Sequence, residues 1–170
     1  MEHLVTPEEV MKLGRPIGKV DHDKLTAYIA ETEHLYIKPT LGTALFLKLI
    51  DEESHDEVLT KLLNGGIYND RQGDVQTLVG LKTTIAYFVY AQNVMSGDFQ
   101  STRYGMVVKD GDFSNRISSK DRSDCYNNTL EVANAYLREC VKYCTSVGLI
   151  QQGGRASAAL GGITIRKIGK

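Results

Sequence analysis

Apolar side chains recur every three or four residues in several stretches of the chain, and turn residues separate these stretches. Such spacing places the apolar positions on one face of a helix, so it predicts helices rather than strands. The expected fold is all-α: a compact bundle of about five helices with one projecting loop or short hairpin and an extended C-terminal arm. After a short first helix at about residues 6–14, the longer helices are expected at about 21–38, 41–50, 54–64, 74–95 and 118–147.

The first helix has a clear start signal. Thr6-Pro7-Glu8-Glu9 places a threonine at the N-cap, a proline at the first helical position and a glutamate at the third, which is a capping box. Val5 and Val10 occupy the two positions of a hydrophobic staple on either side of the cap. The pattern predicts that this helix begins at about residue 6 and ends near Gly14.

A proline-containing dipeptide lies at each end of the second helix. Arg15-Pro16 predicts an extended entry, because the residue before a proline avoids the helical region. Asp21 is then the expected N-cap. Lys38-Pro39 is expected to stop the helix, and Leu41-Gly42 to begin the next apolar run. The apolar positions with helical spacing are Leu25, Tyr28, Ile29, Leu35 and Tyr36.

An acidic cluster, Asp51-Glu52-Glu53, lies between two predicted helices. Acidic clusters can bind metals, but these acids also fit the approach to a helix N-terminus, where negative charge is favourable. Ser54 is the expected N-cap of the following helix, and Asn64-Gly65-Gly66 is expected to close it. Ile67–Gly73 is expected to be a polar loop.

The densest apolar run, residues 85–91, lies within the helix expected at 74–95. A helix that is apolar nearly all round is typical of one enclosed by others, so this helix should be central. The last helix is expected to begin with Ser118 or Ser119 as its cap. Its packing seam, which Gly148 ends, consists of Leu130, Ala133, Leu137, Cys140, Cys144 and Val147.

Residues 98–118 interrupt the helical pattern. Residues 104–108 are β-prone, and Lys109-Asp110-Gly111-Asp112 is a turn signal. A short hairpin or projecting loop is therefore expected between the two long helices.

The C-terminal residues differ in kind from the rest, so the chain is expected to divide into a helical domain at 1–147 and an arm at 148–170. The arm has six glycines, four basic residues and no acid, whereas residues 1–63 carry 12 acids and 7 bases. This asymmetry suggests an appendage with its own partner, whereas a solvated tail is the more common explanation for such a segment. The alternation within residues 163–168 is typical of a strand. The expected contact residues are Arg155, Ile163, Ile165, Arg166, Lys167, Ile168 and Lys170.

Composition is ordinary for a globular protein, with 42% hydrophobic and 24% charged residues. No apolar run approaches the roughly 18 residues of a membrane span, so no membrane contact is expected. The start lacks the pattern of a secretory signal. Three cysteines without regular spacing favour a reducing compartment, and hence synthesis in a cytoplasm.

No catalytic residue, metal ligand or cofactor-binding residue is predicted, and the protein is not expected to be an enzyme. Cys140 and Cys144 lie on the packing seam, which indicates buried thiols rather than zinc ligands. His22 lies between Asp21 and Asp23, a pattern that suits base catalysis but also an ordinary helix start. A phosphate-binding glycine motif is missing, and a net charge of −1 does not indicate a DNA-reading surface.

The order of these motifs resembles the small helical head–tail connector (adaptor, head-completion) proteins of tailed bacteriophages, in particular those of crAss-like phages. The resemblance covers about Arg15–Val147 and rests on the Arg-Pro turn, the helix ending in KPTLG, the aromatic-rich long helix, the loop at residues 102–107 and the final long helix. It marks four residues as a structural motif: Arg15, Pro16, Pro39 and Gly42.

The resemblance implies a structural virion protein. Its copies would form a ring, usually twelve-fold, beneath the portal, extend the DNA channel and provide the docking surface for the tail. The implied partners are other copies, the portal protein, further connector or tail proteins, and passing double-stranded DNA contacted without sequence preference. The implied location is the neck of the virion, after assembly in the host cytoplasm.

We expect the arm to dock on the portal, an adjacent subunit or another connector ring, with residues 163–168 adding as a strand. We expect the loop to face the channel or the portal through Arg103, Tyr104, Val107 and Lys109, and a surface loop without a partner is the alternative. Two other functions remain open from the sequence. One is a small DNA-packaging or nucleic-acid-binding phage protein, and the other is a small hydrolase whose pocket the sequence does not reveal.

Overall fold

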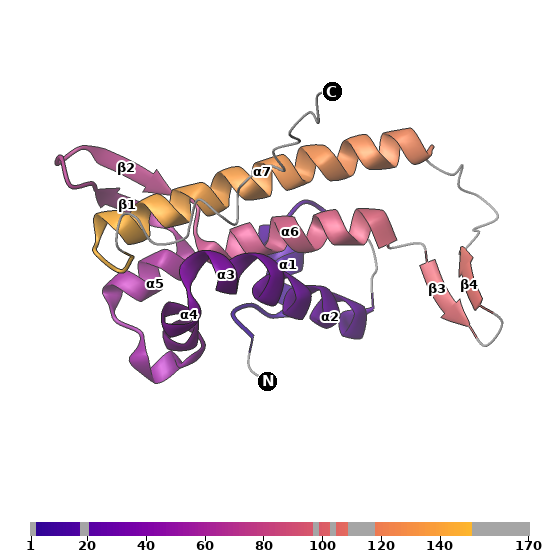
Figure 1. Cartoon of the computed structure of the whole chain (residues 1–170), viewed down its shortest axis with the longest axis horizontal. Coiled ribbons are helices and arrows are strands. Elements are labelled where there is room, and N and C mark those ends of the chain that lie inside the picture. Colours follow the sequence, from indigo (N-terminus) through magenta and orange to yellow (C-terminus); the bar gives the residue numbers. More distant parts are fainter. Residues whose placement is uncertain (1–2, 18–20, 97–98, 103–104, 109–117, 151–170) are drawn as a thin grey trace, which may run out of the picture.

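The computed structural model describes residues 3–17, 21–96, 99–102, 105–108 and 118–150, which form a mostly helical protein with two small antiparallel hairpins (Figure 1). In chain order the elements are α1 (Pro7–Leu13), α2 (His22–Thr32), the π-helix η1 (Glu33–Ile37), α3 (Lys38–Leu41), α4 (Thr43–Ile50), the 3-10 turn η2 (Glu52–Ser54), α5 (Glu57–Asn64), β1 (Gly66–Asn69), β2 (Val75–Leu78), α6 (Leu81–Ser96), β3 (Phe99–Thr102), β4 (Gly105–Val108) and α7 (Ser119–Ser146).

Helix α6 lies in the middle of the structure. Helix α7 packs along one side of it, and α1, α2 and α5 pack against its other sides (Figure 1). The prediction of a central helix from the apolar run at 85–91 is therefore confirmed. The two hairpins lie at opposite ends of the long axis of the molecule (Figure 1). The buried side chains of α6 are Leu81, Thr84, Ile85, Ala86, Phe88, Val89 and Ala91.

The all-α expectation is wrong in the segment that was expected to be a polar loop followed by the first turns of the long helix. Strands β1 and β2 pair antiparallel, with Gly66 opposite Leu78 and Asn69 opposite Val75. Helix α6 consequently begins at Leu81 rather than near residue 74. The β-branched residues between 75 and 77 favour a strand, and a glycine at position 80 with a φ of 95° prevents the helix from starting earlier.

The segment expected to hold a hairpin or projecting loop does contain a hairpin. Strands β3 and β4 pair antiparallel, with Phe99 opposite Val108 and Thr102 opposite Gly105. This pairing also adds a second small sheet to the helical fold. The turn signal at 109–112 lies outside the described residues.

The prediction that Lys38-Pro39 ends the second helix is wrong. Helix α2 continues into η1 and then into α3, so the helical path ends only before Gly42. In the π-helix a backbone N–H bonds to a carbonyl five residues back, as the Lys38 N–H does to Glu33 O. We attribute the tolerance of Pro39 to this wider turn, because proline lacks an N–H and crowds the turn that precedes it.

The extra residue of the π-helix also changes which side chains face the core. Regular spacing placed Leu35 and Tyr36 on the buried face that begins with Leu25. One inserted residue rotates the following positions by about 100°. As a result Leu35 is 64% exposed, whereas Ile37 is fully buried. Tyr36 stays partly buried and stacks on the Phe88 ring, with 4.4 Å between centroids. Glu33, four residues after Ile29, lies before the inserted residue and is buried on the regular face.

The N-cap of α5 is Asp56, not Ser54 as expected. The Asp56 side chain accepts a hydrogen bond from the Leu59 N–H at 2.8 Å. The Ser54 hydroxyl instead donates to Asp51 within the preceding 3-10 turn. The acidic cluster thus lies at a helix approach, as expected, but the cap is two residues later. Gly65 closes α5 with a φ of 82°.

Helix α7 begins with the predicted cap, because Ser118 Oγ accepts a hydrogen bond from the Asp121 N–H at 3.1 Å. Val147 is 39% exposed at the C-terminal end and therefore does not belong to the seam. The next residues remain attached, since Leu149 and Ile150 pack against the core. The division at 147/148 stays a prediction. The buried seam residues are Ala133, Leu137, Cys140 and Cys144.

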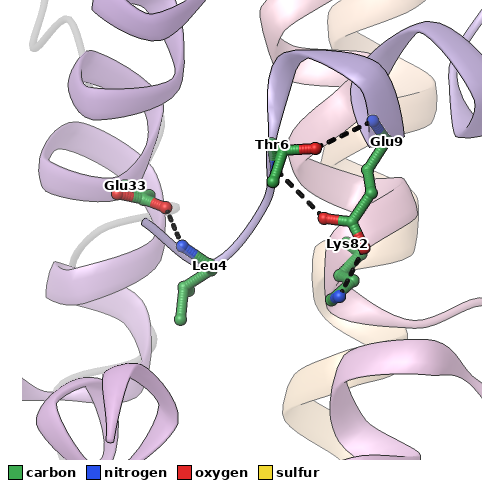
Figure 2. Close-up of polar contacts among 5 residues, drawn as sticks. All are labelled: Leu4, Thr6, Glu9, Glu33 and Lys82. Carbon is green, nitrogen blue, oxygen red and sulfur yellow. Dashed lines mark hydrogen bonds and ion pairs between the residues drawn. The ribbon is translucent and has the colours of Figure 1, made fainter. Parts of the chain in front are cut away.

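The predicted capping box of α1 is confirmed (Figure 2). Thr6 Oγ1 accepts a hydrogen bond from the Glu9 N–H at 3.2 Å, and Glu9 Oε2 accepts one from the Thr6 N–H at 3.0 Å. The other Glu9 oxygen accepts a hydrogen bond from Lys82 Nζ on α6 at 2.6 Å. Partial burial by itself raises the pKa of the Glu9 carboxyl, but the hydrogen bonds from Lys82 and Thr6 hold that pKa below its ordinary value.

A buried carboxyl group anchors the residues that precede α1. Glu33 Oε1 accepts a hydrogen bond from the Leu4 N–H at 2.6 Å, and Glu33 Oε2 lies 2.8 Å from His3 Nδ1 (Figure 2 shows the first of these). Leu4 and Val5 are themselves buried. The segment before α1 is therefore part of the core and is joined to η1 by a polar contact.

The base of the β1–β2 hairpin leaves no room for a side chain. A Cβ atom on Gly80 would lie 2.6 Å from Gly65 N, and one on Gly65 would lie 2.5 Å from Leu78 O. Both glycines also have positive φ angles, which L-residues with a side chain rarely adopt. Backbone contact between the end of α5 and the start of α6 therefore closes this hairpin.

We expect Gly80→Ala to destabilise the protein considerably more than Gly73→Ala. Both positions have a positive φ, which costs an alanine about 1–2 kcal/mol. Only at Gly80 would the new methyl group also collide with backbone, because nothing lies within 4 Å of a Cβ on Gly73. Urea unfolding followed by circular dichroism measures both losses, and equal losses would contradict the tight hairpin base.

Glu33→Gln should lower the free energy of unfolding by about 1–3 kcal/mol, because it replaces a buried acceptor that serves two donors. Glu31→Gln, at an exposed position in α2, is the matched control and should change stability by less than about 0.5 kcal/mol. The same unfolding measurement compares the two variants. A Glu33→Gln protein as stable as the Glu31→Gln protein would show that this anchor contributes nothing.

Candidate functional site

The structure describes only some of the residues that the sequence singled out. All seven arm residues (Arg155, Ile163, Ile165, Arg166, Lys167, Ile168 and Lys170) lie outside the described residues, and so do Arg103, Tyr104 and Lys109. Val107 lies in β4, opposite Gln100 of β3. The arm and loop contacts therefore stay predictions, and the four motif residues can be placed.

Arg15 joins three parts of the fold. Its Nη1 and Nη2 donate hydrogen bonds to Thr129 Oγ1 at 3.0 Å and Asn128 Oδ1 at 2.8 Å, both on α7. Its guanidinium carbon lies 5.9 Å from the ring centroids of Tyr87 and Tyr90 on α6, within the range of a cation–π interaction. Arg15 thus holds the turn after α1 against both long helices.

The other motif residues shape the backbone. Pro16 follows Arg15 in the segment between α1 and α2 and is exposed. Pro39 lies in the first turn of α3, directly after the π-helix. Gly42, with a φ of 86°, ends α3 and begins α4. These positions determine the path of the chain between helices, and their geometry assigns them no chemistry.

The thiols on the α7 seam are poor nucleophiles. Burial raises the pKa of the Cys140 thiol to about 11 and that of the Cys144 thiol to about 12. Thr84 Oγ1 on α6 lies 3.7 Å from Cys140 Sγ. Since the thiolate is the reactive form, both cysteines are inert in the folded state near neutral pH.

The histidine that might have acted as a base lies in a capping arrangement. Asp21 accepts a hydrogen bond from the Asp23 N–H at 3.1 Å, and His22 Nδ1 lies 3.3 Å from a carboxyl oxygen of Glu8. Within the ranges described above, the acidic, histidine and cysteine side chains form no cluster of three that could hold a metal ion. None of the helices within those ranges has the length and hydropathy needed to cross a bilayer.

A polar hollow of about 260 Å³ lies beside the segment before α1. The basic side chains that line it already have partners. His3 contacts Glu33, His55 Nε2 lies 2.9 Å from Leu49 O, and Lys82 binds Glu9. These contacts join the N-terminal segment, α4 and α6, so the hollow marks the junction between these elements.

A second, open hollow of about 340 Å³ lies where the tip of the β1–β2 hairpin meets the end of α7. Arg71 at the tip donates hydrogen bonds to the carbonyls of Thr145 and Ser146. A cation at this position is favourable, because the C-terminal end of a helix carries partial negative charge. The hairpin tip is thereby fastened to the last turn of α7.

The inner face of the hairpin is fastened as well. The Tyr68 ring packs edge-on against the Tyr143 ring, with 4.9 Å between centroids, and Leu78 is buried. Tyr143 Oη in turn donates a hydrogen bond to Val58 O at 3.1 Å. The hairpin is therefore held against α7, which is in turn bonded to α5 through Tyr143.

Within the described part of the chain, the outer face of the hairpin is exposed instead. The register places Ile67 opposite Thr77 and Asn69 opposite Val75, so these four side chains share one face. Ile67 is 66% exposed and Val75 is 70% exposed, the two largest exposures among the large apolar side chains of the described residues. We call these four residues the outer hairpin face, and it is the strongest candidate for a binding surface.

Sequence reasoning did not predict this surface, because residues 67–73 were interpreted as a polar loop. A usable signal was present. Asp70 Oδ1 accepts hydrogen bonds from the N–H groups of Gln72 and Asp74, which is the turn chemistry expected of an aspartate before a glycine. A turn of this kind between residues with strand preference indicates a hairpin.

Comparison with known proteins adds a family. The chain matches no curated protein and no solved structure. A family model described as "Family of unknown function (DUF6712)" matches residues 37–146, well over half of the chain. The matched residues run from the end of η1 to the end of α7 and include both hairpins. The protein therefore belongs to the DUF6712 family of unknown function.

Proposed function

We propose that this protein is a subunit of a ring, twelve-fold by its resemblance to connectors, that lies beneath the portal of a tailed bacteriophage. The ring would extend the DNA channel and join the capsid to the tail. The protein would act through its surfaces in the neck of the virion, after assembly in the host cytoplasm, and it would catalyse no reaction.

The outer hairpin face is the observation that carries this proposal. Large apolar side chains that are exposed on a fixed element are typical of contacts between proteins. A ring needs a heterologous contact, in which one face of a subunit fits a different face of its neighbour. The β1–β2 hairpin, on which Ile67 and Val75 are exposed, lies at one end of the molecule, and the β3–β4 hairpin lies at the other end (Figure 1). An elongated subunit of this kind would present separate surfaces to its neighbours and to other rings.

The remaining partners follow from the resemblance described for the sequence. The portal, further connector or tail proteins and passing duplex DNA are the proposed contacts of the ring. Arg103 and Lys109, near the second hairpin in the sequence, are the proposed DNA or portal contacts. A sequence-reading role in packaging is less well supported, because the described helices include no exposed basic helix of the kind that enters a groove.

The proposal is tested with the portal protein of the same phage. The purified protein, mixed with assembled portal, should form a ring on the portal that negative-stain electron microscopy resolves. The variant Ile67→Lys, Val75→Lys should lose at least tenfold in ring occupancy, because two ammonium groups prevent the outer hairpin face from being buried. Both positions are exposed, so folding should change by less than about 0.5 kcal/mol.

Leu35→Lys, Leu47→Lys is the matched control, because these residues are 64% and 59% exposed on other elements. It introduces the same charge and should still form rings. A wild-type protein that stays monomeric beside its portal would remove the connector role. Equal loss in both variants would show that the hairpin has no special part in assembly.

A further inference from the structure

We propose that the outer hairpin face and an adjoining strand edge bind residues 163–168 of a second copy of this chain, which add to the hairpin as a third strand. This inference rests on the proposed function, since it names the partner of the surface that the ring contact uses.

The hairpin has the features of an acceptor. It consists of two strands only, so each strand has an outer edge without a further strand beside it in the described structure. Its inner face is held by Tyr68 against Tyr143, and its tip is held by Arg71 against α7. An added strand therefore meets a template that is already ordered, and little conformational entropy is lost on the acceptor side.

Residues 163–168 have the matching features of a donor strand. The sequence alternates Ile-Thr-Ile-Arg, so in an extended conformation Ile163 and Ile165 would share one side. Strand addition gives affinity through backbone hydrogen bonds, and alternate side chains give specificity. On the hairpin, the two isoleucines would extend the apolar row of Ile67 and Val75.

Charge complements this pairing. Residues 151–170 carry four basic residues and no acid, and two of the basic residues, Arg166 and Lys167, lie within the donor strand. Asp70 and Asp74 flank the tip of the acceptor hairpin. The tip also contains the cationic side chain of Arg71, but this side chain already donates hydrogen bonds to carbonyl oxygens of α7. A basic strand is therefore favoured at this hairpin over an acidic one.

The length of the connection indicates a second copy rather than the same chain. The last described residues lie beside the hairpin, because Arg71 binds the carbonyl of Ser146 at 3.2 Å. A return to the same hairpin would need a connection of only about 2–5 residues. Twelve residues, 151–162, separate Ile150 from the donor strand. A glycine-rich segment of this length spans on average about 20 Å and at most about 40 Å, which is suited to reaching a neighbour.

The test uses two full-length variants, each of which lacks one half of the contact. The hairpin-blocked variant carries Ile67→Lys and Val75→Lys and has an intact arm. The arm-blocked variant carries Ile163→Lys and Ile165→Lys and has an intact hairpin. Neither variant makes the contact alone, and a mixture makes it only between copies. Amide hydrogen exchange with mass spectrometry distinguishes the two arms by peptide mass.

In the mixture, at several hundred micromolar, amides of 163–168 in the hairpin-blocked variant should exchange about tenfold more slowly than in that variant alone. Residues 66–78 of the arm-blocked variant should become protected at the same time. An arm-blocked partner that also carries Leu35→Lys and Leu47→Lys should give the same protection. A partner blocked at both its hairpin and its arm should give none.

Two results would overturn the inference. One is a mixture with no protection of 163–168. The other is protection in the wild-type protein that is independent of concentration and absent from the mixture, which would place the strand on its own hairpin. The portal takes no part in this experiment. It therefore tests this inference separately from the portal experiment described above. If rings form on the portal but residues 163–168 stay unprotected in the mixture, only this inference is overturned. If those residues become protected but the protein does not bind its portal, only the connector role is overturned.

Discussion

The packing of α6 between α7 and the N-terminal helices is the constraint on which the rest of this structure depends. Ile85, Phe88 and Val89 are almost completely buried, and burial of each such side chain contributes about 1.5–3 kcal/mol. Because both faces of α6 are covered, its two ends have fixed positions. The first hairpin precedes Leu81, and the second follows Ser96 within a few residues. The hairpins are therefore carried at opposite ends of the molecule by one rigid helix (Figure 1).

Polar contacts between distant residues hold the remaining segments onto this frame. Arg15 joins the turn after α1 to both long helices, and Glu33 binds the backbone before α1. Lys82 adds a contact from α6 to the cap of α1 (Figure 2). A buried polar group without a partner is costly, so each contact favours one arrangement of the segments it joins over the alternatives. Arg15, Glu33 and Lys82 therefore have structural roles, and the proposed function requires none of them as a reacting group.

The chemistry of the described residues and the shape of their surface support the same proposal. The thiols on α7 are buried with raised pKa values, and the basic groups around the polar hollow have partners. Among the large apolar side chains of the described residues, Ile67 and Val75 on the outer hairpin face are the most exposed, and the opposite face of the hairpin packs on Tyr143. A rigid element with one free apolar face is suited to receiving another chain. The basic, strand-prone residues at the C-terminal end of the sequence provide a chain of the required chemistry.

The sequence by itself determined the features that depend on neighbours a few residues apart. The capping box at Thr6, the cap at Ser118 and the seam through Leu137 are all read from contacts within one or two helical turns. The alternation in the arm is a local pattern of the same kind. Tertiary structure decided the π-helix that carries Pro39 and the hairpin at 66–78, because each depends on partners far along the chain. Tyr68 packs on Tyr143, and Glu33 at the start of the π-helix binds Leu4. A local pattern does not contain those partners, so it could suggest the proposed donor strand but not the surface proposed to receive it.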